Sequence, residues 1–94
     1  IIMILEVVSP EATLFSGEVN SVTVPGANGA FQVLDNHAPI VSILNPGTVK
    51  IGGKISLPEE TAHNFKQQGE ETFLELPNGG TVEMQQNKIV LLAD

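Results

Sequence analysis

The chain has 94 residues, a length that predicts a single domain with a modest hydrophobic core. Eleven carboxylates against four lysines give a net charge of −7, the wrong sign for phosphate backbones or anionic lipid headgroups. Tryptophan, tyrosine and cysteine are all absent, which removes the usual stacking platforms for bases and sugars, disulfides and thiolate metal sites. Nucleic acid binding and direct lipid insertion are therefore not expected.

The first segment, Ile1–Val8, is apolar on both sides and indicates a β-strand. It has no basic flank and is interrupted by Glu6, so it is too short and too polar for a signal peptide or a membrane span. Ile89–Ala93 at the other end of the chain is also apolar on both sides. Such strands are either central in a sheet or covered by another molecule.

Between these ends, short runs rich in β-branched residues alternate with turn signals. Val22–Val24, Thr48–Ile51 and Thr81–Met84 each have one apolar and one polar side, as half-buried strands do. Glycine, proline and asparagine separate the runs at regular intervals, a rhythm typical of an antiparallel sandwich or barrel. The turn signals are Ser9-Pro10, Ser16-Gly17, Pro25-Gly26, Asn28-Gly29, Asn45-Pro46-Gly47, Gly52-Gly53 and Asn78-Gly79-Gly80.

The stretch Gly26–Pro39 combines glycine-rich turns, a short apolar strand and a histidine-proline loop. Asp35 is the single formally charged residue from Val19 to Val49. An uncharged surface of this kind typically meets another protein.

Leu57–Gly69 breaks the strand rhythm. Pro58 suits a first helical position, Glu59 and Glu60 suit a first turn, and Gly69 suits a helix end. We predict a short helix or an ordered loop around residues 58–68.

No catalytic, cofactor or metal site is predicted. His37 and His63 lack partners at metal-ligand spacing, and the pair Asp35 and His37 would be the only basis for a small acidic hydrolase. The glutamate pairs Glu59-Glu60 and Glu70-Glu71 are interpreted as solvated charges, and the glycine-rich turns as turn chemistry rather than phosphate loops.

The order of several motifs resembles one protein family, the epsilon subunit of F-type ATP synthase. The similarity covers nearly the whole chain apart from residues 52–70. The motifs are Leu5–Glu11, Phe15–Val19, Val22–Gly26, Gly29–Phe31, Asn36–Pro39, Leu44–Val49, Gly80–Met84 and Ile89–Asp94.

The resemblance implies an all-β fold, a flattened antiparallel β-sandwich of about ten short strands in a single domain over residues 1–94. It also implies a non-catalytic rotor subunit, without cofactor or small-molecule substrate, that couples proton or sodium translocation to ATP synthesis. Its expected partners are the gamma subunit and the c-subunit ring, on the cytoplasmic face of a bacterial plasma membrane. Long members continue past the equivalent of Asp94 into two helices, a domain expected to be absent here. The alternative is a general β-sandwich interaction or adaptor module.

Carried over by position, the resemblance implies two contact regions. The region implied to face the gamma subunit comprises Ser9, Ile40, Val41 and Ser42. The region implied to face the c ring comprises Gly26, Ala27, Asn28, Gly29, Ala30, Asp35, Asn36 and His37. Relatives often carry an acidic residue near Asn28 or Ala30 and a glycine where Gln32 stands, so the resemblance does not imply a c-ring contact through a carboxylate at Asn28 or Ala30 in this chain.

Overall fold

A computed structural model describes residues 3–34 and 38–94, which form ten β-strands and one turn of 3-10 helix. The elements are β1 (Met3–Val8), β2 (Thr13–Val19), β3 (Ser21–Gly26), β4 (Gly29–Leu34), β5 (Ile40–Leu44), β6 (Gly47–Gly52), η1 (Ala62–Asn64), β7 (Phe65–Gln68), β8 (Glu71–Leu76), β9 (Gly80–Gln85) and β10 (Lys88–Ala93). All strands are short, as the spacing of the turn signals predicted.

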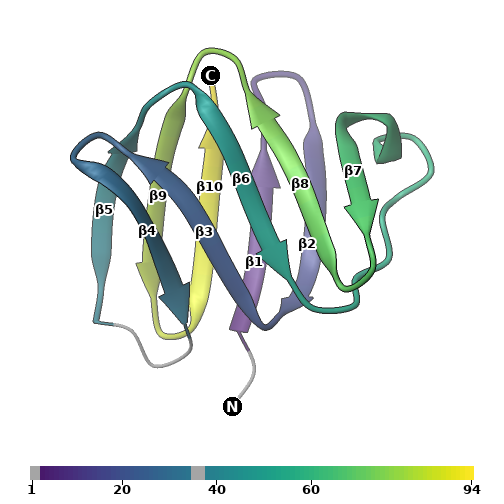
Figure 1. The fold of residues 1–94 in the computed structure, drawn as a ribbon, viewed down its shortest axis with the longest axis horizontal. Helices are drawn as coiled ribbons and strands as arrows, with labels where there is room; N and C mark the ends of the chain where they lie inside the picture. Colours follow the sequence, from purple (N-terminus) through teal and green to yellow (C-terminus); the bar gives the residue numbers. More distant parts are fainter. Residues whose placement is uncertain (1–2, 35–37) are drawn as a thin grey trace.

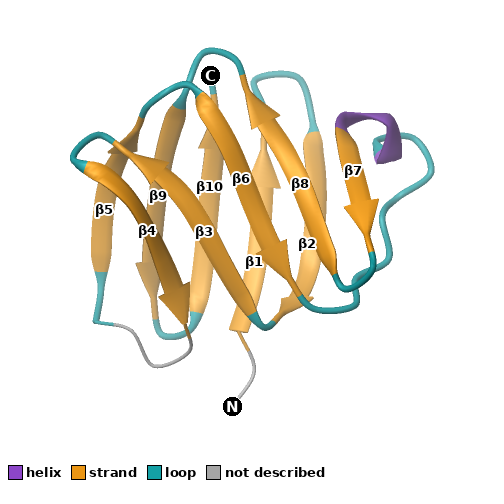
Figure 2. Ribbon diagram, viewed as in Figure 1, coloured by secondary structure: helices purple, strands orange, loops and turns teal. Residues whose placement is uncertain are grey.

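The strands are arranged in two layers (Figures 1 and 2). The back layer has the order β2-β1-β10-β9-β5, and the front layer runs β3-β6-β8-β7 with β4 beside β3. The layers meet at one corner, where Gly26 of β3 pairs with Leu44 of β5 and the Asn45 amide donates to the Pro25 carbonyl at 2.8 Å. The principal extents of 32 × 31 × 22 Å are those of a flattened body, and the predicted β-sandwich is confirmed.

The core lies between the two layers and follows from the alternation of the strands. In β1, the side chains of Met3, Leu5 and Val7 are buried while the residues between them are half-buried. Ile51 of β6 and Ile89 of β10 are fully buried in the same cluster. Because successive side chains point to opposite faces, one row of each strand fills the space between the layers.

One strand pair departs from the antiparallel pattern. The first and last strands, β1 and β10, lie side by side and run parallel, with Leu5 opposite Ile89 and Val7 opposite Leu91. Every other pair among the described strands is antiparallel. The two runs that are apolar on both sides are thus central strands of the back layer. This was one of the two interpretations of their pattern, the other being a strand covered by another molecule.

The segment around residues 58–68 is ordered but mostly not helical. Only Ala62–Asn64 form a helical turn, and Phe65–Gln68 then form β7, a strand that the polar sequence did not predict. Phe65 pairs with Leu74 of β8 and packs against the core together with Ile55 and Leu57. These apolar anchors reach the core from an extended chain, so a longer helix would pull them away from it.

The same segment links the two layers at the edge opposite the β3–β5 corner. The Thr61 hydroxyl donates a hydrogen bond of 2.6 Å to the Leu14 carbonyl of β2. This bond is partly buried, and it holds the connection before β7 against the edge strand of the back layer.

Candidate interaction surfaces

The turn predicted to face the c ring is a tight hairpin between β3 and β4. Gly26 pairs with Gly29, and Gly29 has a φ of +123°, a backbone region that favours glycine. Ala27, Asn28 and Ala30 are exposed, so the turn offers small uncharged side chains to any partner. The turn stands at one end of β4, beside the β5–β6 turn (Figure 1).

The remaining residues of that predicted region, Asp35, Asn36 and His37, lie outside the described residues. Leu34, the last residue of β4, stands at the opposite end of this strand from the Gly29 turn. That the Gly26–Ala30 turn and residues 35–37 form one contact therefore stays a prediction.

Ser9, predicted to face the gamma subunit, begins the turn between β1 and β2. Its amide donates to the Ala12 carbonyl at 2.8 Å, and its hydroxyl donates to the same carbonyl at 3.1 Å. The Ala12 amide in turn donates to the Ser9 hydroxyl at 3.2 Å. These bonds fix Ser9 at the end of β1, directly after Val8.

The other segment predicted to face gamma, Ile40–Ser42, is the first part of β5, and its side chains divide between two sides. Ile40 packs against the core, and Ser42 lies on the same inward side, half-buried. Val41 is 76% exposed and Ile43, which the prediction did not include, is 68% exposed. This division could not be predicted from the sequence, because the residues on both sides of Ser42 in β5 are apolar.

Val41 and Ile43 belong to a larger surface, the outer side of the back layer. Strand register places Ile43, Thr81 of β9, Leu92 of β10 and Val8 of β1 in one row across four strands. A second row contains Val41, Glu83, Val90 and Glu6, and a third contains Gln85, Lys88 and Ile4. We call this surface the outer apolar face, and its apolar members are Ile4, Val8, Val41, Ile43, Val90 and Leu92.

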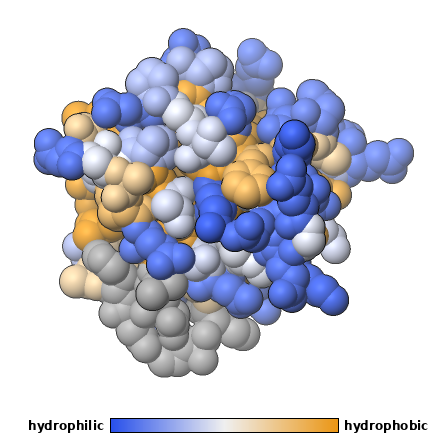
Figure 3. All heavy atoms as spheres, in the orientation of Figure 1, coloured by the Kyte–Doolittle hydropathy of each residue, from blue (hydrophilic) through white to orange (hydrophobic). Residues whose placement is uncertain are grey.

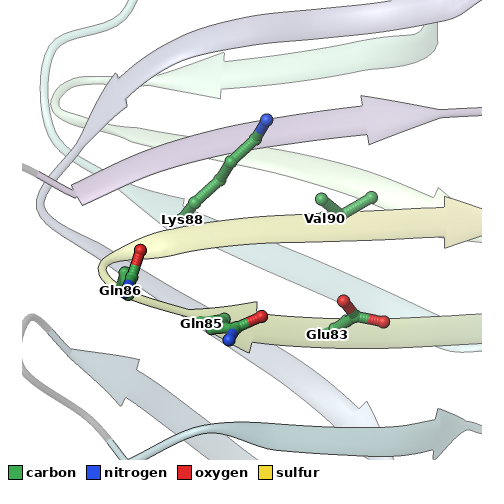
Figure 4. A pocket seen from close by; sticks show the side chains of 5 residues that line it. All are labelled: Glu83, Gln85, Gln86, Lys88 and Val90. Atoms are coloured by element: carbon green, nitrogen blue, oxygen red, sulfur yellow. The ribbon is translucent and has the colours of Figure 1, made fainter.

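Carboxylates border the outer apolar face. Glu6, Glu18 and Glu83 lie on it or at its rim, and Lys88 is its one cation among the described residues. None of these four side chains forms an ion pair in the described part of the chain. A shallow groove of about 440 Å³ on this face is lined by Glu83, Gln85, Gln86, Lys88 and Val90. In Figure 4, Glu83 lies beside Val90 and the Lys88 side chain extends toward β1.

The outer side of the front layer is polar by contrast. The Thr48 hydroxyl donates to a carboxylate oxygen of Glu75 at 2.6 Å, and Lys50 pairs with Glu71 at 2.9 Å. Figure 3 shows this face, where hydrophilic atoms cover much of the surface and apolar atoms lie at the left, where β4 and β5 lie, and in a smaller group near the centre.

The described residues contain no group of three or more histidine and carboxylate side chains that could hold a metal ion. His63 lines a groove with Glu60 and Asp94 near the β1–β2 turn, but no hydrogen bond or ion pair joins these three side chains. No helical segment in residues 3–34 and 38–94 has the length and apolar character needed to cross a membrane.

The sequence matches a known protein family. Residues 2–94 match the model of the family described as ATP synthase, Delta/Epsilon chain, beta-sandwich domain. The chain belongs to this family. The resemblance seen in its ordered motifs is thereby confirmed.

Curated relatives of the chain agree with the family model. It is 38% identical over 90 residues to the ATP synthase epsilon chain of Chlorobaculum tepidum, covering 96% of this chain and 86% of the relative. It is 36% identical over 90 residues to the ATP synthase epsilon chain of Desulforamulus reducens, covering 96% of this chain and 57% of that relative. The chain thus spans most of one relative and little more than half of the other.

A solved structure shares the fold. A chain in the cryo-EM structure of the Tetrahymena thermophila mitochondrial ATP synthase central stalk and c ring matches with a TM-score of 0.66 and 14% identity. The match covers 96% of this chain and 61% of that chain. At this identity the similarity concerns the fold.

Proposed function

We propose that this delta/epsilon chain is a non-catalytic subunit of the central stalk of an F-type ATP synthase. The observation that carries the proposal is the family match over residues 2–94. In this role the chain binds the gamma subunit and contacts the c ring, at the cytoplasmic face of a bacterial plasma membrane. It helps to transmit ring rotation, driven by protons or sodium ions, to the catalytic head.

The architecture suits a part that must transmit force without deforming. Two layers share one close-packed core, and hydrogen bonds link them at both edges. At one edge the Asn45 amide donates to the Pro25 carbonyl and the Ala27 amide to the Ile43 carbonyl, and at the other the Thr61 hydroxyl donates to the Leu14 carbonyl. A body linked in this way resists shear between its layers, which is the deformation that torque on one face would produce.

The two proposed contact regions adjoin each other in the described residues, because the Ala27 amide of the β3–β4 turn donates to the Ile43 carbonyl of β5 at 3.0 Å. The proposed gamma contact includes Ser9 and the exposed side of β5, and the proposed c-ring contact includes the Gly26–Ala30 turn together with residues 35–37. Val41 is a better probe of the proposed gamma contact than Ser42, because Val41 points outward and is more exposed.

Co-elution tests the function directly. The chain is mixed with the gamma subunit encoded in the same genome and analysed by size-exclusion chromatography with light scattering. A stable one-to-one complex is expected. A folded chain that forms no complex with gamma would overturn the rotor assignment and favour the general interaction module.

A second experiment addresses the ring contact. The complex of gamma and this chain is passed over immobilised c ring in detergent, with wild-type chain and with Asn28→Arg. The bulky charge in the exposed turn is expected to reduce retention while gamma binding persists. Equal retention of the two complexes would place the ring contact elsewhere.

A further inference from the structure

Asparagine is followed by glycine at two places in the chain, Asn28-Gly29 and Asn78-Gly79. In such a pair the backbone nitrogen of the glycine can attack the side-chain carbonyl carbon of the asparagine, because glycine has no side chain to obstruct the approach. The attack closes a succinimide ring and releases ammonia. Water then opens the ring at either carbonyl and leaves aspartate or isoaspartate. The net change is the loss of a neutral amide and the gain of a carboxylate.

The two asparagines have similar surroundings. Both are exposed, and neither side chain forms a hydrogen bond with another residue in the described part of the chain. Both side chains are therefore accessible to an attacking nitrogen. A difference in reactivity between the two pairs must come from the glycines that follow them.

Gly79 is held firmly where the chain crosses from β8 to β9. It is buried, its amide donates to the Leu76 carbonyl at 3.2 Å, and its carbonyl accepts from the Asp94 amide at 3.1 Å. Its φ is +70°, and a Cβ at this position would collide with the Leu44 carbonyl. The Gly79 nitrogen therefore cannot turn toward Asn78 unless the crossing separates from β5 and from the end of β10.

Gly29 lies in a far more open place, at the tip of the β3–β4 hairpin. It is exposed, and a Cβ at this position would meet nothing within 4 Å. Its strand partner is Gly26, in the pair that closes the hairpin, and Gly29 is the first residue of β4. Strand ends and loop tips open at much lower free energy than buried segments. The Gly29 nitrogen can therefore reach the Asn28 side chain while the core stays intact.

We propose that Asn28 is a site of spontaneous deamidation in the native chain, and that the fold protects Asn78 from the same reaction. The reaction needs only water and hydroxide, which removes the proton from the attacking Gly29 nitrogen. It places a negative charge in a turn whose other exposed side chains, Ala27 and Ala30, are uncharged. Isoaspartate also inserts a methylene group into the backbone of the turn, between residues that pair tightly as Gly26 and Gly29.

The consequence for assembly rests on the proposed function. The Gly26–Ala30 turn is part of the proposed c-ring contact, so a new carboxylate in it is expected to weaken retention on the ring. A turn that the ring covers is also prevented from opening. Deamidation is therefore confined to chains that have not been assembled, and it marks those that have remained free for long.

Peptide mapping by mass spectrometry tests the site. The folded chain is kept in mildly alkaline buffer at physiological temperature, and samples are digested briefly with trypsin. Cleavage after Lys50, Lys66 and Lys88 places Asn28 and Asn78 on different peptides. Deamidation at Asn28 is expected to be at least about tenfold faster than at Asn78, since each rate follows the population of the open form. Equal rates in the folded chain would overturn the proposal.

The unfolded chain is the control for local sequence. In concentrated guanidinium chloride both pairs lose their surroundings, so the two rates are expected to converge, with the larger increase at Asn78. If Asn78 stays slow in the unfolded chain, its neighbours Pro77 and Gly80 protect it rather than the fold. That result would overturn the protective role assigned to the β8–β9 crossing.

Two variants test the consequence for assembly, each as a complex with gamma on immobilised c ring. Asn28→Ser cannot deamidate and keeps the turn uncharged, whereas Asn28→Asp carries the charge of the product from the start. After the same incubation, wild type is expected to lose retention toward the level of Asn28→Asp, while Asn28→Ser keeps its initial retention.

The outcomes separate the modification from the proposed function. If deamidated wild type is retained as well as fresh wild type, the effect on assembly is overturned and the modification site stands. If fresh wild type is not retained at all, the proposed ring contact fails, and the effect on assembly fails with it. The peptide map decides the modification site in either case, because it needs no partner.

Discussion

The two outer faces of the sandwich are built from strands of similar length and pairing, yet their surfaces differ. The front face carries polar side chains that satisfy one another, as Thr48 does with Glu75 and Lys50 with Glu71. The back face carries Val41, Ile43 and Leu92 beside carboxylates without ion-pair partners in the described residues. The polar side chains of the front face are paired with one another and need no partner molecule, whereas the back face has the mixed apolar and charged composition of a protein–protein interface.

The two sides of β10 offer the sharpest test of this difference. Leu91 is 0% exposed and Leu92 is 46% exposed, so the same substitution probes core and surface on one strand. Leu91→Ala is expected to cost about 2–5 kcal/mol of unfolding free energy, and Leu92→Ala less than about 1 kcal/mol. Urea titration followed by far-UV circular dichroism measures both, because the chain has no tryptophan or tyrosine for fluorescence.

The loss of affinity for gamma is expected to be larger for Leu92→Ala than for Leu91→Ala, the opposite of the order in stability. Leu92→Ala should weaken binding, and Leu91→Ala, where still folded, should leave it nearly unchanged. A parallel loss of stability and affinity in both variants would remove the distinction between core and contact on this strand.

A substitution at Gly80 is expected to disturb the connection between the front and back layers. It begins β9, where the chain crosses from the front layer to the back layer, and a Cβ here would collide with the Leu92 carbonyl. Gly80→Ala is expected to cost about 2–3 kcal/mol, since the neighbour is backbone and cannot rotate away. Thermal unfolding by circular dichroism checks this value.

The matched control is Gly69→Ala, where φ is +64° but a Cβ would meet nothing within 4 Å. Its cost should be about 1 kcal/mol, from backbone strain alone. Similar losses for the two variants would show that the layers tolerate movement at the β8–β9 crossing.

The β3–β4 turn lies outside both faces, so the stability cost of a substitution there should not depend on either face. Gly29→Val is expected to cost about 1–2 kcal/mol, because a β-branched residue fits a φ of +123° poorly. Ala30→Val, one residue on and already in an exposed strand, should cost almost nothing. Chemical denaturation of both variants decides whether the turn is strained as its backbone angle indicates.

The polar pairs of the front face should have the smallest effects. Lys50 and Glu71 are each nearly half exposed, so Lys50→Met is expected to change stability by at most about 0.5 kcal/mol, and by less in 1 M salt. Gamma affinity should not change. A clear loss of gamma binding in this variant would show that the front face also forms a contact.

The sequence predicted most strands because their alternation and turn residues are local signals. Val22–Val24 and Thr81–Met84 could be recognised from their own residues. β7 could not, because Phe65 is its one apolar residue and the strand forms through the free edge of β8. The parallel pairing of β1 and β10 was equally hidden, since a strand's partner is not encoded in its local pattern.

The outer apolar face illustrates the same limit. In β5 and β10 both sides are apolar, so periodicity cannot say which residues reach the core. The polar residues of the neighbouring strand show which side faces outward. Thr81 and Glu83 lie on the outer side of β9, and the strand register places Ile43 and Leu92 on that same side. Ser9 and Val41, which the resemblance implied for the gamma contact, lie at two borders of this face, and strand register was needed to show which residues lie between them.

The parallel pairing of the first and last strands has a consequence for biosynthesis. Ile4 pairs with Lys88, so nearly the whole chain must be made before β1 gains this neighbour. Contacts so distant in sequence slow folding, and this pairing cannot form until β10 has been translated. Until β10 leaves the ribosome, β1 carries an open apolar edge, and that interval is when a nascent chain of this family depends most on protection from aggregation.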